Sequence, residues 1–304
     1  MLTAKGGFFV LKKGERMSSE IIDVNGAESQ YEAEKECLNI VTNKRNQTPA
    51  VKSVLAKITN NGDYKIIPGA SNQPLDFTII EPETGLFKGG IEHFSIGFEY
   101  TRNKGIRIFS KLQTEKGKET YNHYHNNLDG NEIAALNDLT QIAKNELLAV
   151  KAFNYNQFIQ EFNRIMSKHL KKIDSYCDRI GCSHKDICFL IDLCIPCAVK
   201  WQVNYGNEYK KQNHDQFPIS KGFIDVLKTA SPYGIEDIIL TIHDTWGRYY
   251  ERVLYFNTSN IEKSCKRQNL AICNDFKPLS FPNIKDVEVV HRNGQFDIYY
   301  SFGS

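Results

Sequence analysis

Two acidic residues in the first third of the chain have the types and the spacing to hold a metal ion. Asp76 and Glu92 each begin a predicted strand, and the connection between the strands is rich in turn formers. Carboxylates on neighbouring strands can converge on Mg²⁺, which needs only one or two of them besides water and substrate phosphate. A magnesium ion held there would stabilise the charge on a scissile phosphate and generate a hydroxide nucleophile. Glu34 or Glu32, on a preceding predicted helix, is expected to supply an auxiliary acid.

The order of these elements resembles a known family. An acidic helix is followed by a strand, by Pro74 and Asp76 at a second strand, and by Glu92 on a third. This order is similar to the core of the PD-(D/E)XK restriction-endonuclease-like superfamily, over residues 27–112 with a later helix and strand at 220–243. The resemblance implies an endonuclease that hydrolyses DNA, with the Asp and the Glu as Mg²⁺ ligands. It also implies a Lys two positions after the Glu that helps to activate water.

The chain departs from the family pattern at this lysine. Glu92 is followed by His93 and Phe94, so an aromatic ring stands where the Lys is expected. Lys104 or Lys88 is expected to take the role of the missing lysine, and His93 is an alternative base. The Pro and the Asp of the first motif also stand one residue further apart than in the family pattern.

Strand alternation separates Glu92 from its neighbour. Glu92 alternates with Phe94 and Ile96, whereas His93 shares the opposite face with Ser95. A sheet covered by helices on both faces tolerates this pattern, because Glu92 would lie at the end of its strand. The competing interpretation is a hairpin with carboxylates at exposed strand ends.

A second class of function fits the same residues. The missing lysine and the near balance of 38 Lys and Arg against 36 Asp and Glu also fit a non-catalytic protein-binding module. Such a module would be an immunity or inhibitor protein, or an accessory subunit of a defence system. Its partner is a protein or a second copy of the chain in a homodimer, whereas the enzyme's partner is nucleic acid. In the enzyme Asp76, Glu92 and a basic side chain should meet; in the binding module they should diverge.

Cysteine and histidine residues gather in the middle of the chain. Thiolates and imidazoles in a tetrahedral arrangement bind Zn²⁺, and closed sites commonly use closely spaced Cys pairs. Cys194 and Cys197 have that spacing, but they lie in an apolar run where a free cysteine is usually a small buried hydrophobe. Buried reduced thiols are therefore favoured over a zinc or redox site for the whole set: Cys177, Cys182, His184, Cys188, Cys194 and Cys197.

Two further polar segments have simpler interpretations. Residues 121–131 resemble a His-Asn-His nuclease signature, but the polar loop leads straight into a helix, and a helix cap is favoured. Thr241 and His243 lie near the end of a predicted strand, with Asp244 next to the histidine. A His beside an Asp can act as a general base. No nucleophile is apparent beside them, which favours an ordinary strand-to-turn boundary.

Composition predicts a globular, cytoplasmic protein. The hydrophobic fraction of 41% and the charged fraction of 24% are near globular averages. The first residues lack the apolar run and cleavage site of a secretory signal. The longest apolar segment, 187–199, is too short for a membrane span and contains Asp192. No membrane partner is expected, and the eight cysteines are expected to be reduced.

Periodicity and turn residues predict an α+β fold. Helices are expected at 27–41, 49–58, 133–173, across 177–211 with a break at Pro196, and at 220–229. Strands are expected at 64–67, 75–81, 91–101, 105–112, 237–243 and 249–257, with a hairpin at 287–300. The expected architecture is a mixed sheet with an antiparallel meander, flanked by helices, with a helical insertion. Residues 1–112 would form the first helices and the meander, 113–217 the helical region, and 218–304 would complete the same domain.

Overall fold

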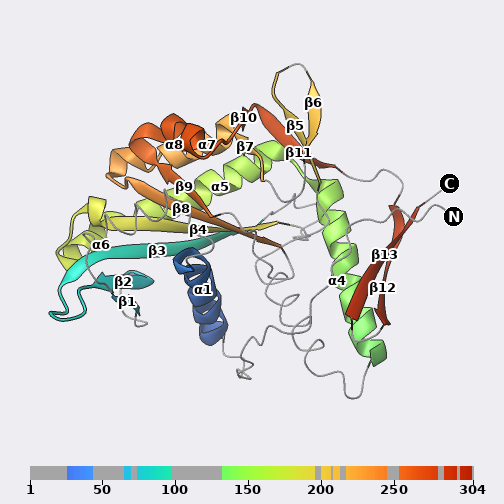
Figure 1. Cartoon of the computed structure of the whole chain (residues 1–304), viewed down its shortest axis with the longest axis horizontal. Coiled ribbons are helices and arrows are strands. Elements are labelled where there is room, and N and C mark those ends of the chain that lie inside the picture. The colour runs from blue at the N-terminus through green and yellow to red at the C-terminus, as the bar shows by residue number, and fades with distance from the viewer. Residues whose placement is uncertain are drawn as a thin grey trace.

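A mixed sheet of six strands forms the centre of the computed structural model (Figure 1). The model describes residues 26–43, 65–69, 74–97, 132–195, 200–206, 208–212, 217–244, 253–279, 284–292 and 295–302. In spatial order the strands are β1 (Lys65–Pro68), β2 (Phe77–Ile80), β3 (Phe87–Gly97), β4 (Ile187–Ile195), β8 (Asp237–Asp244) and β9 (Leu254–Asn257). The first three strands pair antiparallel, β3, β4 and β8 pair parallel, and β9 is antiparallel to β8. The predicted α+β class and its mixed sheet are confirmed.

Helices cover both faces of this sheet. The helix α1 (Gly26–Thr42) lies against one face, and α5, α7 and α8 lie on the other side of the sheet (Figure 1). The described helices after α1 are α4 (Glu132–Ala152), α5 (Tyr155–Leu170), α6 (Ile173–Ile180), α7 (Lys221–Lys228) and α8 (Ile261–Arg267). Short 3-10 turns lie at His184–Asp186, Ser231–Tyr233 and Thr258–Asn260. Parallel strands require such cover, because helical crossover connections place helices on the faces of the sheet.

The strand β4 corrects one prediction. Residues 177–211 were expected to be largely helical, yet Ile187–Ile195 is a strand in which every residue is buried. It pairs parallel with β3 on one side and β8 on the other. A strand covered on both faces is apolar throughout, so its sequence has no period of two and cannot be told from a buried helix by pattern.

Two buried clusters lie on opposite faces of the sheet and set the side on which each polar residue lies. Cys37, Leu38 and Val41 of α1 pack against the sheet residues Phe77, Ile79, Ile91, Cys188, Leu190 and Ile239. The larger cluster joins Phe94, Phe189, Ile191, Leu193, Ile238 and Leu240 to apolar residues of α5, α6 and α7. Alternate residues of β3 and β4 therefore contact different helices.

Smaller sheets complete the described fold. The antiparallel sheet β11-β5-β6 contains β11 (Asp275–Leu279), β5 (Lys200–Asn204) and β6 (Tyr209–Gln212), and a short pair joins β10 (Ile272–Cys273) to β7 (Ile219–Ser220). The predicted C-terminal hairpin is confirmed as β12 (Ile284–Arg292) and β13 (Gln295–Phe302), which lies beside α4 (Figure 1).

The central sheet takes strands from all three predicted segments of the chain: β1 to β3 from the first, β4 from the second, β8 and β9 from the third. The predicted helix at 49–58, strand at 105–112 and loop at 121–131 lie outside the described residues. Among the residues that are described, no helix is long and apolar enough to cross a membrane.

Candidate functional site

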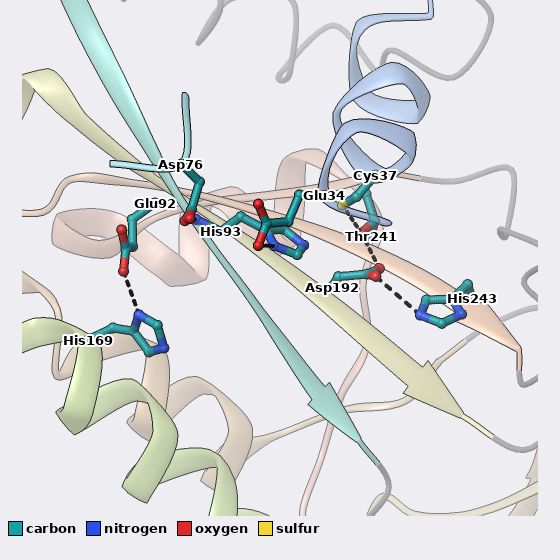
Figure 2. Close-up of polar contacts among 9 residues, drawn as sticks. All are labelled: Glu34, Cys37, Asp76, Glu92, His93, His169, Asp192, Thr241 and His243. Carbon is teal, nitrogen blue, oxygen red and sulfur yellow. Dashed lines mark hydrogen bonds and ion pairs between the residues drawn. The ribbon is translucent and has the colours of Figure 1, made fainter. Parts of the chain in front are cut away.

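The strand β3 places Glu92 and His93 on opposite faces of the sheet. Glu92 lies with Phe94 on the face covered by α5 and α6, whereas His93 lies beneath α1. Both side chains are buried, at 3% and 6% relative exposure. The predicted alternation is confirmed, and the two residues belong to two different polar clusters (Figure 2).

Asp76 is fixed next to Glu92 by contacts of its backbone and its carboxylate. The register of β2 on β3 pairs Phe77 with Ile91. One further antiparallel step places Asp76 alongside Glu92. The backbone N–H of His93 donates to Oδ2 of Asp76 at 2.6 Å.

Gly69 holds the backbone at Asp76 in place. The N–H of Gly69 donates to the backbone carbonyl of Asp76 at 2.7 Å. A Cβ atom added at Gly69 would lie 2.1 Å from the carbonyl oxygen of Leu75. Only glycine allows this close approach of two backbone segments.

Glu92 contacts two side chains at the junction of α5 and α6. Its Oε1 lies 2.6 Å from Nδ1 of His169, and the hydroxyl of Tyr176 donates to the same oxygen at 3.4 Å. The His169 ring also stacks on Phe94, with 4.2 Å between the ring centroids. Burial raises the pKa of Glu92 to about 7, although the positive charge of Lys172 acts in the opposite direction. A cation near Glu92 would therefore favour the ionised form of its carboxyl group over the protonated form.

The charges of the three predicted acidic residues act on groups around Glu92. Glu34 of α1 is buried at 8% exposure and helps to raise the pKa of Glu92. The charges of Glu92 and Asp76 add to the effect of burial in raising the pKa of the Tyr176 phenol. The structure thus places Glu92 in the middle of β3 and not at the start of its strand as predicted, and a cation there would relieve the negative charge around it.

The basic residues near Glu92 are not those predicted from the sequence. Lys88 instead forms an ion pair with Glu81 at 3.3 Å, and Lys104 lies outside the described residues. His93 is on the opposite face, with its Nδ1 3.9 Å from Oε1 of Glu34. The basic side chains beside Glu92 are those of His169 and Lys172.

His169 and Lys172 could have been found only in part from the sequence. They stand three positions apart, His169 in the last turn of α5 and Lys172 at the N-cap of α6, and a basic residue complements the dipole at the C-terminal end of a helix such as α5. That position indicates only an ordinary structural role. It does not indicate that either residue approaches Glu92. Their approach to Glu92 depends on the packing of α5 and α6 across β3.

A second polar cluster lies beneath α1. Nε2 of His243 is 3.1 Å from Oδ2 of Asp192, and the hydroxyl of Thr241 donates to Oδ1 of the same carboxylate at 2.7 Å. Thr241 Oγ1 also lies 3.0 Å from Sγ of Cys37. Burial alone would raise the pKa of Asp192, but the charge and hydrogen bond of His243 outweigh it and lower the pKa to about 2. The same pairing raises the pKa of His243 well above its usual value, against the opposing effect of burial.

The strands explain how this second cluster forms. Asp192 of β4 is in register with Thr241 of β8, two residues before His243. Asp192 appears in the sequence only as a single charge within an apolar run. The interpretation of Thr241 and His243 as a plain strand end did not anticipate their buried contacts with Asp192.

The predicted cysteine and histidine set is dispersed. Sγ of Cys182 lies 3.7 Å from Sγ of Cys177, whereas Cys188 packs against α1 on the other face of the sheet. His184 pairs with Asp174 at 3.1 Å. Cys197 lies outside the described residues. Those of the set that are described do not converge on one point, and none of the described cysteines among them is in a disulfide.

Comparison of the chain with models of known protein families, with curated proteins and with solved structures finds no match.

Proposed function

We propose that the chain is a metal-dependent nuclease that hydrolyses phosphodiester bonds of DNA, with Asp76 and Glu92 as ligands of Mg²⁺. The observation that carries the proposal is the adjacency of Asp76 and Glu92 on the β2–β3 pair, next to the basic side chains of His169 and Lys172. Neighbouring positions on paired strands are what the enzyme requires of these two residues, and this supports the proposal.

The donor set suits a hard cation. Carboxylate oxygens are what Mg²⁺ prefers, and it accepts one or two of them with the remaining positions left to water and substrate phosphate. Glu34 would serve as the auxiliary acid, because its negative charge acts on Glu92. A bound Mg²⁺ would lower the charge on the scissile phosphate and provide a hydroxide nucleophile at neutral pH.

Under this proposal, the residues around Asp76 and Glu92 have different roles. Asp76 is oriented by the N–H of His93, and Glu92 by His169 and Tyr176. Lys172 supplies the positive charge that the missing motif lysine would have supplied, and its charge already acts on Glu92. His169 can hold a proton between its Nδ1 and Glu92, which makes it the nearest candidate for proton transfer.

The test is cleavage of plasmid DNA, single-stranded DNA and RNA by the full chain, with Mg²⁺ and with chelator. Asp76→Asn and Glu92→Gln should each lower Mg²⁺-dependent cleavage by about 100-fold or more, because each removes a metal ligand. Glu83→Gln is the matched control, because Glu83 is an exposed carboxylate in the turn between β2 and β3. Unchanged cleavage by Asp76→Asn would overturn the proposal. A wild-type chain that cleaves no nucleic acid would favour the protein-binding alternative.

A further inference from the structure

The cluster beneath α1 brings together residues from four elements that are far apart in sequence. Cys37 comes from α1, His93 from β3, Asp192 from β4, and Thr241 and His243 from β8 (Figure 2). All five are buried, with relative exposures between 0% and 8%. We propose that Cys37, His93 and Asp192 bind a zinc ion, at a site separate from the one formed by Asp76 and Glu92.

The geometry of the three donors is close to that of a metal shell. One ligand atom from each of Cys37, His93 and Asp192 lies within 4.8 Å of the other two. Zinc holds sulfur, nitrogen and oxygen ligands at about 2.0–2.3 Å, which places tetrahedral ligand atoms roughly 3–4 Å apart. Small side-chain movements therefore close the shell. Three protein ligands leave a fourth position, which zinc fills with water in other sites of this kind.

The chemistry of the donors selects the kind of ion. A thiolate and an imidazole are typical zinc ligands, whereas Mg²⁺ prefers oxygen donors alone. The Cys37 thiolate and the Asp192 carboxylate together supply two negative charges to a divalent cation. The site thus discriminates against the Mg²⁺ that the proposed nuclease centre requires.

Three further residues, Glu34, His243 and Thr241, lie next to the proposed ligands. Oε1 of Glu34 lies 3.9 Å from Nδ1 of His93. His243 and Thr241 each contact one oxygen of Asp192, at 3.1 Å and 2.7 Å. Ligating histidines and carboxylates in metal sites are generally oriented by such partners.

The hydrogen bonds also define where the thiol proton lies without metal. Thr241 uses its hydroxyl proton for Asp192, so the 3.0 Å contact with Cys37 places the thiol as the donor. Metal binding would replace this proton, since the thiolate is the form that coordinates zinc.

Burial argues against the competing use of the same residues in covalent catalysis. A Cys, a His and an Asp can form a nucleophilic triad. Cys37, however, has 0% relative exposure, so a substrate cannot reach its sulfur in this structure. An ion bound by Cys37, His93 and Asp192 would join α1 to β3 and β4.

The experiment uses the full chain stripped with chelator and titrated with Co²⁺, which replaces zinc and reports its ligands by absorption. The expected result is about one Co²⁺ per chain with a thiolate-to-cobalt charge-transfer band that Zn²⁺ abolishes. Cys37→Ser should remove the band and weaken binding by at least about 10-fold. Cys188→Ser is the matched control, because Cys188 is equally buried on the same face but outside the cluster, and it should keep the band.

A second measurement uses only the wild-type chain, in case Cys37→Ser does not fold. Zn²⁺ should protect Cys37, but not Cys188, from thiol alkylation in mild denaturant, with the modified residues identified by mass spectrometry. Absence of the charge-transfer band in the wild type, or equal alkylation of Cys37 with and without Zn²⁺, would overturn the proposal. Asp76→Asn should bind Co²⁺ like the wild type, so a failure of the zinc site is distinguishable from a failure of the nuclease.

Discussion

The backbone N–H of His93 donates a hydrogen bond to the Asp76 carboxylate at 2.6 Å, which ties the residue before β2 to the middle of β3. The side chain of His93 lies on the opposite face, beneath α1, beside Glu34. One residue therefore contacts both polar clusters, through its backbone on one side and its ring on the other. Structural and ligand roles of Asp76 can be separated by the choice of substitution.

Asp76→Ala should destabilise the fold by about 1–3 kcal/mol, because it leaves the part-buried N–H of His93 without its carboxylate acceptor. Asp76→Asn keeps an acceptor oxygen of the same shape and should cost less than about 1 kcal/mol. Urea unfolding of the two variants beside the wild type measures the difference. An equal loss of unfolding free energy in both variants would show that the charge of Asp76, and not its hydrogen bond, stabilises the fold.

Gly69→Ala should destabilise the chain by about 1–3 kcal/mol and also reduce Mg²⁺ binding, because the new Cβ would displace the segment that carries Asp76. The clash is with the backbone oxygen of Leu75 at 2.1 Å, which no side-chain rotation relieves. Gly85→Asn is the control: it has a positive φ of 69° that Asn tolerates and open space around its Cβ. Thermal unfolding and a Mg²⁺ titration of both variants provide the comparison.

Glu92→Gln should stabilise the metal-free protein at pH 8 and have little effect at pH 5. The pKa of Glu92 is raised from its usual 4.5 to about 7 by burial, so the folded chain binds this proton more tightly than the unfolded chain. The contribution of Glu92 to stability is therefore full below pH 4.5 and is lost as the pH rises through about 7. The gain at pH 8 should be about 1–3 kcal/mol, since the contact with His169 offsets part of the cost of a buried charge.

Chemical unfolding in the presence of chelator at the two pH values measures this gain, with Glu83→Gln as an exposed control. A gain for Glu92→Gln that is larger at pH 5 than at pH 8 would contradict the assigned direction of the pKa shift.

Lys172→Gln should lower nuclease activity by about 10-fold while leaving the fold intact, because it removes a positive charge near Glu92 that is not part of the apolar core. The pKa of Glu92 should rise further, since Lys172 now favours the ionised form. Cleavage rates at saturating Mg²⁺, beside Lys171→Gln on the adjacent exposed position, measure the effect. Equal rates for Lys172→Gln and the wild type would assign the cationic role to His169 alone.

Local sequence pattern was sufficient for the elements whose signal is contained within them. The amphipathic helix α1, the antiparallel strands β1 to β3 and the C-terminal hairpin were all predicted. Their hydrophobic periodicity and turn residues are local features of the sequence, visible within each element. The alternation of Glu92 and His93 across β3 was predicted for the same reason, and the structure confirms it.

Tertiary packing decided what no local pattern contains. The apolar run of β4 was read as helix, because a strand buried on both faces has no alternation, and its place between β3 and β8 follows only from parallel pairing. The approach of His169 to Glu92 spans 77 positions, and the contact of Cys37 with Thr241 spans 204. The sequence by itself determined which residues can carry charge or bind metal and, for Glu92 and His93 of β3, that they lie on opposite faces of the strand. Which of them meet depended on how the helices close over the two faces of the sheet, because burial of apolar surface, and not any local preference, sets that arrangement.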